Sequence, residues 1–185
     1  MPPLKTLGLI GGMSWESTTL YYQLLNRIAR ERLGGQHSAK LVLWSVDFAP
    51  IARMQSAGLW DEATGVMVDA ARRLERAGAE AIVICANTMH RMADDVAAAV
   101  SPPVLHVADA TAAAVRAAGV RRPLLLATRF TMEQDFYRAR LKKNGRARCR
   151  QPLRNQRSSN PARRAVLHLR PSFEDRACPS WSFPR

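Results

Sequence analysis

The sequence contains little cysteine. Its three cysteines, Cys85, Cys149 and Cys178, are too few for a disulfide framework in a chain of 185 residues. No CxxC pair and no paired Cys/His cluster occurs, so the spacing does not suggest a zinc site. The glycines between residues 8 and 12 lack the G-x-G-x-x-G spacing, which leaves a dinucleotide cofactor weakly supported.

Long apolar runs are also absent. No stretch approaches the roughly 18 to 20 apolar residues that a membrane span requires, and no signal peptide is visible. We therefore expect a soluble, cytoplasmic protein with no membrane partner. Hydrophobic residues nevertheless make up 47% of the chain, which is ample for a folded core.

Acidic residues are scarce relative to basic ones, and the formal net charge is +13. Such a charge is typical of nucleic-acid-binding proteins, but it is unevenly distributed. Residues 144–185 carry ten arginines and two acidic residues, whereas residues 1–143 carry 18 basic and 13 acidic residues. The basic stretch lacks interleaved aromatic residues and any known motif. A non-enzymatic basic module that binds nucleic acid is therefore the less favoured alternative.

Residues 4–143 alternate short apolar runs with helical patterns. This βαβα order predicts an α/β fold, in which a parallel sheet is flanked by helices on both faces. A helix that begins after Ser14 carries an amphipathic pattern, with Leu20, Leu24, Leu25 and Ile28 at helical spacing. The predicted strands are 4–10, 41–46, 81–85, 104–107 and 124–127, and the predicted helices are 15–32, 60–77, 88–100, 110–118 and 132–141.

The composition changes after about residue 143. Residues 144–185 contain no Lys, Ile, Met or Tyr, are rich in Arg, Pro and Ser, and show no persistent period. Two interpretations remain open: a disordered basic tail, or a stretch translated out of frame from a GC-rich gene. We expect a first α/β domain over 1–118, the start of a second over 119–143, and the tail over 144–185.

Reactive and polar residues follow three of the predicted strands, at 11–14, 85–88 and 128–131. Ligands bind beyond the carboxyl ends of parallel strands, so these segments should converge. Cys85 closes an apolar strand, and a helix that begins near Thr88 could lower its thiol pKa, which would make it a nucleophile or a base. The alternative is that Cys85 is a small buried hydrophobe, which free cysteine usually is.

The neighbouring residues also have structural alternatives. Asn87 and Thr88 fit either a substrate carboxylate or the cap of the next helix. The glycines at 11 and 12 could let backbone amides approach a small anion at a helix start. His90 is interpreted as a packing or surface residue, and Thr128 and Thr131 as turn and cap residues unless a substrate is present.

Taken together, several stretches resemble the aspartate/glutamate racemase family, the cofactor-independent amino-acid racemases. The resemblance covers about residues 4–143, and its motifs occur in the family's order. The stretches are 8–18 (GLIGGMSWEST), 45–48 (SVDF), 75–79 (ERAGA), 85–90 (CANTMH), 106–110 (HVADA) and 128–137 (TRFTMEQDFY).

The resemblance implies a flavodoxin-like racemase domain that faces a second, similar one, with an amino acid such as aspartate or glutamate between them. One cysteine thiolate removes the α-proton and an opposite thiol returns one, so this isomerase needs no pyridoxal phosphate and no metal. The family also suggests a homodimer. By motif, Cys85 is the catalytic acid/base, and the substrate-binding residues are Met13, Gln55, Asn87, Thr88, Thr128 and Thr131.

The sequence departs from the family in one respect. The family's second cysteine lies in a Gly-Cys-Thr context, and neither Cys149 nor Cys178 matches it. The likeness stops near residue 143, as a frameshift followed by a premature stop would produce. We therefore expect an inactive or impaired chain, an exposed Cys85, and exposed apolar surface that promotes association. The remaining alternative is a one-cysteine decarboxylase or isomerase of the same superfamily.

Overall fold

The computed structural model describes residues 4–120 and 123–145, with side chains up to residue 143. The chain divides into a unit of residues 1–151 and a second of residues 152–185, and the second lies outside the described residues, as do Cys149 and Cys178. Predictions for the basic tail fall there as well. The strands are β1 (Leu7–Gly11), β2 (Leu41–Ser45), β3 (Ala81–Ile84) and β4 (Val104–Leu105).

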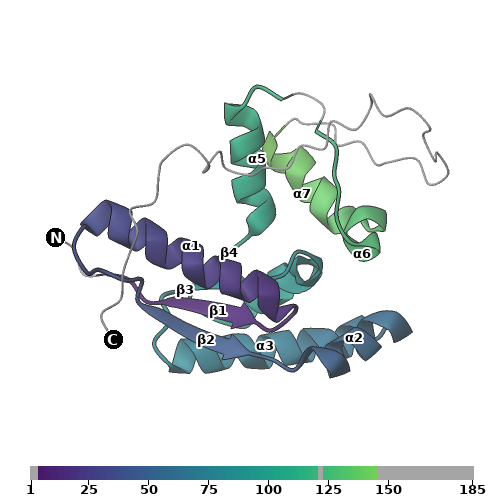
Figure 1. Ribbon diagram of the computed structural model, residues 1–185. Coiled ribbons are helices and arrows are strands. Elements are labelled where there is room, and N and C mark those ends of the chain that lie inside the picture. Colours follow the sequence, from purple (N-terminus) through teal and green to yellow (C-terminus); the bar gives the residue numbers. More distant parts are fainter. Residues whose placement is uncertain (1–3, 121–122, 146–185) are drawn as a thin grey trace. The chain divides into compact units, whose positions relative to one another are not determined.

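These four strands form one sheet in the order β2-β1-β3-β4, and each neighbouring pair is parallel (Figure 1). The parallel sheet predicted from the βαβα alternation is thus confirmed. The helical elements are α1 (Trp15–Leu33), α2 (Phe48–Ala57), α3 (Trp60–Arg76), the 3₁₀ helix η1 (Thr88–Met92), α4 (Ala93–Ala98), α5 (Val107–Ala117), α6 (Arg129–Glu133) and α7 (Asp135–Gly145).

Helices cover both faces of the sheet, as predicted (Figure 1). Alternate residues of a strand point to opposite faces, so Gly8 and Gly11 of β1 face different helices. A Cβ atom at Gly8 would lie 3.1 Å from the Cβ of Leu74 in α3, and one at Gly11 would overlap Thr18 in α1. Glycine at these two positions therefore lets α3 and α1 pack close to the central strand.

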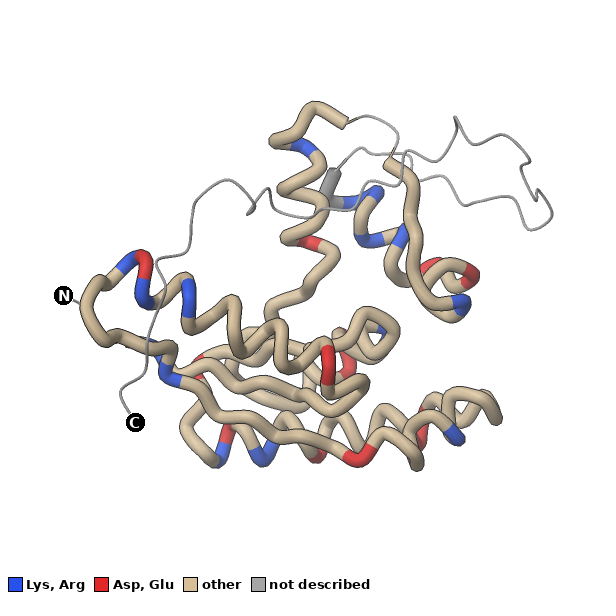
Figure 2. Tube along the Cα trace, viewed as in Figure 1, with Lys and Arg blue, Asp and Glu red and all other residues tan. Residues whose placement is uncertain are grey.

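The main core lies between α3 and the sheet. The apolar stripe predicted for this helix is buried at Met67, Ala70, Ala71 and Leu74, while Trp60 is partly buried. Each fully buried Met or Leu side chain contributes about 1.5–3 kcal/mol relative to an exposed one. The charged residues of α3 are of both signs, with Asp61 and Glu62 in its first turn and Arg73 and Arg76 in its last turn (Figure 2).

The amphipathic pattern predicted for α1 does not correspond to a buried face. Thr18 and Ala29 are its buried residues, whereas Leu20 is 59% exposed and Leu24 and Ile28 are exposed as well. The helix approaches β1 through small side chains, and periodicity in a sequence identifies an apolar face without identifying what covers it. None of the described helices is long and apolar enough to cross a membrane.

Three element predictions need correction. The strand expected at 124–127 is not formed: Leu124 makes an isolated bridge and residues 125–128 are irregular. The neighbouring β4 pairs over only two residues, which leaves a short edge for another strand. Helix α2 was not predicted, and the side chain of Asp47 begins it by accepting a hydrogen bond from the amide of Ala49 at 3.0 Å. The helix expected over 132–141 is split at Gln134 into α6 and α7.

Helices α5 and α7 form a second, smaller apolar cluster. Its buried members are Ala108, Ala112, Tyr137 and Leu141. The connection between these helices includes residues 127–128 and the start of α6. The cluster therefore positions one side of the candidate site described next.

Candidate functional site

A pocket of about 630 Å³ lies where the ends of β1 and β3 meet the segment before α6. Its lining includes residues 13–14 after β1, residues 85–89 after β3, and residues 127–130. The structure thus brings together six of the seven predicted site residues in the wall of one pocket, and the seventh, Thr131, lies directly behind two of them. The six are Met13, Gln55, Cys85, Asn87, Thr88 and Thr128.

Cys85 is held at the end of β3 with its thiol buried. Its amide donates to the carbonyl of Ile10 at 2.9 Å, and the residue is 1% exposed. Burial raises the pKa of the thiol to about 12, so Cys85 is a neutral thiol at pH 7. The expectation of an exposed Cys85 was therefore wrong, and of the two alternatives for its thiol the burial agrees with the small buried residue and not with a lowered pKa. The element that follows is one turn of 3₁₀ helix, whose small dipole does not offset the loss of solvent.

Three threonine hydroxyls form a closed ring beside the pocket. The Oγ1 atoms of Thr88 and Thr128 are 2.9 Å apart, those of Thr88 and Thr131 are 3.1 Å apart, and those of Thr128 and Thr131 are 3.2 Å apart. Thr131 is fully buried, whereas Thr128 is exposed at the pocket. Each hydroxyl carries one donor proton, so the ring holds three donors that can turn toward a bound anion.

The capping alternatives for this segment are confirmed for the positions of Asn87 and Thr128 but not for their side-chain bonding. Asn87 and Thr128 occupy the cap positions of η1 and α6, but neither side chain makes a capping hydrogen bond. The anion alternative for the glycines stays a prediction; the amide of Gly12 itself is engaged, because it donates to the hydroxyl of Thr18 at 3.0 Å. Gly12 has φ +92°, and a Cβ atom there would collide with the backbone of Val46, so glycine is required for steric reasons.

Two residues of α1 in the pocket wall were missed by sequence reasoning. The hydroxyl of Ser17 lies within hydrogen-bond distance of the carbonyl of Cys85. Tyr21 lies one turn further along, and its pKa is raised by burial and then by the proximity of Cys85 and Tyr137. The signal for both was their spacing from Ser14, because residues three and four apart share one face of a helix.

The remaining polar residues of the wall come from α2 and α6. Gln55, whose helix was not predicted, donates from Nε2 to the sulfur of Met89 at 3.0 Å. Among the described residues that line the pocket, Arg129 is the one that carries a formal charge, and its guanidinium lies 5.3 Å from the ring centre of Phe130. Arg129 was missed although it lies between two predicted site residues. It makes this side of the pocket suited to an anion.

Comparison with known proteins agrees with this geometry. The Asp/Glu/Hydantoin racemase family model matches residues 10–167. The assigned Asp/Glu racemase from Yersinia pestis is 50% identical with a TM-score of 0.76, and the match covers 80% of this chain and 65% of that chain. The aspartate racemase homologue from Pyrococcus horikoshii OT3 is 37% identical with a TM-score of 0.72 and the same two coverages.

A third solved structure, the aspartate racemase from Picrophilus torridus, is 22% identical and shares the fold with a TM-score of 0.66, over 80% of this chain and 62% of that chain. The chain thus spans about 65% of the length of the first two relatives. The family match continues to residue 167, beyond residue 143, where we expected the likeness to end. Because this match includes the strand ends that form the pocket and well over half of the sequence, the chain belongs to the Asp/Glu/Hydantoin racemase family.

Proposed function

We propose that this chain carries one half of an amino-acid racemase site, in which Cys85 exchanges a proton with the α-carbon of the substrate without pyridoxal phosphate or a metal. The observation that carries this proposal is the meeting, in one pocket, of a buried thiol, a ring of three threonine hydroxyls and a guanidinium. Family membership supports the same reaction class.

The hydroxyl ring is suited to hold the substrate carboxylate. Thr88 and Thr128 line the pocket, and Thr131 supports both from behind. A carboxylate would accept hydrogen bonds from hydroxyls that turn out of the ring, and charge-assisted bonds of this kind are stronger than the neutral bonds they replace. Arg129 supplies a positive charge for a second carboxylate, which makes aspartate and glutamate the first substrates to test.

The proton transfer then follows from the state of the thiol. Cys85 starts as a neutral thiol, because its pKa is about 12. The α-ammonium group of a bound amino acid would bring a positive charge beside the sulfur and lower that pKa. As the substrate binds, the thiol releases its proton to solvent; the thiolate then takes the α-proton, the electron pair moves into the α-carboxylate, and a proton delivered to the opposite face inverts the centre. Met13, Gln55 and Asn87 line the same pocket and would orient the substrate.

The second acid is the part that we propose to be missing. Among the described residues, Cys85 is the free cysteine that the structure contains. Loss of one of two acid/base groups removes a contribution of roughly 10²- to 10⁴-fold. We therefore expect little or no racemisation from this chain alone.

The decisive experiment is α-proton exchange of L-aspartate, L-glutamate and other amino acids in D₂O, followed by NMR. Exchange above the uncatalysed rate is expected in the full chain and should be lost in Cys85→Ala. Cys178→Ala is the matched control and should leave exchange unchanged. Formation of D-enantiomer that survives Cys85→Ala would contradict the role of Cys85.

The presence of a single thiol in the pocket wall also favours a second candidate, a one-cysteine decarboxylase or isomerase of the same superfamily. Turnover of a malonate or a maleate, without exchange of any amino acid, would support it over racemisation.

The quaternary and domain assignments are proposals of the same kind. Family membership supports a homodimer, which sedimentation analysis of the purified chain would test. It also supports a cytoplasmic location, which fractionation of cells that express the chain would test. We also propose that residues 1–118 form the first α/β domain, that residues 119–143 begin a second, and that residues 144–185 form a separate tail. Limited proteolysis should then cut first near residue 144.

A further inference from the structure

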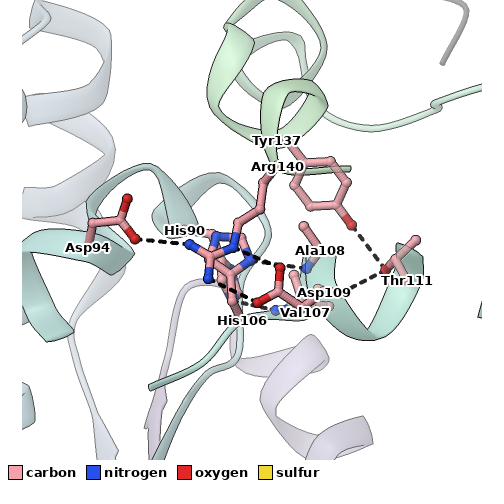
Figure 3. A network of polar contacts seen from close by, with 9 residues as sticks. All are labelled: His90, Asp94, His106, Val107, Ala108, Asp109, Thr111, Tyr137 and Arg140. Carbon is pink, nitrogen blue, oxygen red and sulfur yellow. Dashed lines mark hydrogen bonds and ion pairs between the residues drawn. The ribbon is translucent and has the colours of Figure 1, made fainter. Parts of the chain in front are cut away.

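His90 connects the loop after Cys85 to the start of α5. Figure 3 shows its place beside Val107, at the α5 end of this connection. Its ring is buried, with 3% of the residue exposed. Nε2 accepts a hydrogen bond from the amide of Val107 at 3.2 Å, and Nδ1 lies 2.9 Å from the carbonyl of Ala86. Because Nε2 is an acceptor, the neutral ring carries its proton on Nδ1 and donates it to Ala86. One side chain therefore binds the residue next to Cys85 and the first residue of α5.

The charged groups around this ring come from α4, α5 and α7 (Figure 3). The ring of His106 is centred 4.5 Å away, and its Nδ1 accepts from the amide of Ala108, which caps α5. The guanidinium of Arg140 binds Asp109 through Nε at 2.8 Å and Nη2 at 2.9 Å, and it binds Asp94 through Nη1 at 2.9 Å.

These surroundings keep His90 neutral. Burial, followed by the proximity of His106 and Arg140, lowers its pKa to about 4, although its hydrogen bond to Ala86 opposes the shift. The acidic groups nearest to it, Asp94 and Asp109, are paired with Arg140. A protonated ring would present an N–H group to the amide of Val107, and the bond to α5 would break.

We propose that His90 is a positioning residue for Cys85: its Nδ1–H fixes the carbonyl of Ala86, and thereby the backbone that holds the thiol in the pocket. This inference rests on the proposed function for the importance of Cys85, but not for its test. The carbonyl of Cys85 is held by Ser17 and its amide by Ile10, so the peptide after Ala86 is the next one that needs a fixed partner. Rotation of the peptide between Ala86 and Asn87 would change the backbone that leads from Cys85 to Thr88.

The two bonds of the ring can be removed separately. Asparagine places an amide nitrogen near the position of Nδ1, so His90→Asn keeps a donor for Ala86 and loses the acceptor for Val107. Glutamine places its terminal group near the position of Nε2, so His90→Gln keeps the acceptor and loses the donor. If His90 positions Cys85 through Ala86, the two variants should affect the thiol differently.

The test uses the full chain with Cys149→Ala and Cys178→Ala, so that Cys85 is the single thiol. Its reaction rate with 4,4′-dithiodipyridine at pH 7 should rise about tenfold in His90→Gln, the effect of one net hydrogen bond, and stay near the parent rate in His90→Asn. Amide exchange at Val107, measured by NMR, should show the reverse order. The amide of Ile82, in the middle of the sheet, is the internal reference for global stability.

A space-filling role for His90 predicts another outcome. In that case both variants expose Cys85 equally, or His90→Asn, which is the smaller side chain, exposes it more. Either result would overturn the proposal. Thiol reactivity does not require catalysis, so the two proposals fail separately: absence of substrate exchange would contradict the proposed function, while the order of the two variants would still decide the role of His90.

Discussion

Two regions of the described chain meet at the pocket, and they are held together by different forces. The region of β1, β3 and α3 is closed by a contiguous cluster of fifteen buried apolar residues. The region of α5, α6 and α7 has a cluster of four. The sheet region therefore presents Cys85 from a rigid strand end, whereas the helical region presents Thr128 and Thr131 from a segment with little core of its own.

Polar contacts from the segment 88–94 attach the helical region to the sheet region. They are the bonds from Thr88 to Thr128 and Thr131, from His90 to Val107, from Arg91 to Gln134 at 2.6 Å, and from Asp94 to Arg140. One apolar contact joins the regions as well, because the rings of Trp60 in α3 and Phe130 in α6 meet edge to face with their centres 5.6 Å apart. A net hydrogen bond contributes about 0.5–1.5 kcal/mol, less than a buried Leu or Met side chain. The pocket should therefore open from the helical side first.

The largest expected effect concerns the thiol on the rigid side. With a pKa of about 12, Cys85 has a thiolate fraction at pH 8 roughly 10³-fold below that of an unperturbed cysteine. Alkylation by iodoacetamide, in a chain with Cys149→Ala and Cys178→Ala, should be slower than that of a model thiol by about this factor. The rate should rise tenfold per pH unit up to pH 10. A plateau of the alkylation rate near pH 9 would mean that the pKa of Cys85 is close to that of a free thiol, which would contradict its burial in the sheet region.

Core truncation should separate the two regions. Leu74→Ala removes a fully buried side chain beneath β1 and should lower the free energy of unfolding by about 2–5 kcal/mol. Leu141→Ala, in the small cluster, should accelerate amide exchange in α5 and α7 and leave the amides of β1 and β3 protected. Urea denaturation and hydrogen exchange measure the two effects. Equal loss of protection throughout the chain after Leu141→Ala would mean that the regions unfold as one.

Acid should act on the junction between the regions. The pKa of His90 is lowered to about 4, so below its ordinary value of 6.5 the unfolded chain binds a proton that the folded chain does not. The stability that comes from keeping His90 neutral is therefore fully present above pH 6.5. It is lost as the pH decreases toward 4, by roughly 1.4 kcal/mol per pH unit.

Urea denaturation at pH 7 and pH 4.5 measures this loss. His90→Gln should be less stable than the parent at pH 7, and the difference should shrink at pH 4.5, because glutamine does not titrate. Amide exchange should rise in α5 before it rises in β3. A difference that stays constant with pH would mean that His90 is not the group that titrates.

The sequence could predict the regions where local pattern and tertiary environment agree. The stripe of α3 and the continuous apolar run of β3 need burial whatever their partner is, and both are buried. The meeting of Met13 with Cys85 and Thr88 followed from the rule that parallel strands end at the same edge, whereas Thr128 was placed in the same pocket by the family motifs, since the strand expected before it does not form.

Other features depend on neighbours that are distant in sequence. Burial of the apolar side chains of α1 depends on whether another element packs against them, and these side chains are exposed. A strand at 124–127 likewise needs a neighbouring strand to pair with, and it does not form. The raised pKa of Cys85 has the same origin, because desolvation by the surrounding fold outweighs the local turn. Ser17 and Arg129 were missed because the sequence pattern does not show which hydroxyl or guanidinium groups will line the folded pocket.

The smallest expected effect is at Arg140, which joins α7 to α5 and α4. Arg140→Ala removes a bidentate ion pair with Asp109 and a single bond to Asp94. Because the guanidinium is partly exposed to solvent, the free energy of unfolding should fall by about 1 kcal/mol, and by less in high salt. Amides of α5 and α7 should exchange faster while those of the sheet do not change.

Arg138→Ala is the matched control, because the ion pair that Arg138 makes within the described residues is with Asp135 of the same helix. It should leave exchange in α5 unchanged. Amide exchange of α5 in Arg140→Lys should lie between that of the parent and that of Arg140→Ala. An ammonium group keeps the charge but cannot form the paired bonds of a guanidinium to one carboxylate. If Arg138→Ala loosens α5 as much as Arg140→Ala does, the helical region depends on the charge or helicity of α7 rather than on its bonds to the rest of the fold. The contrast between a region closed by apolar packing and one attached by polar contacts would then be wrong.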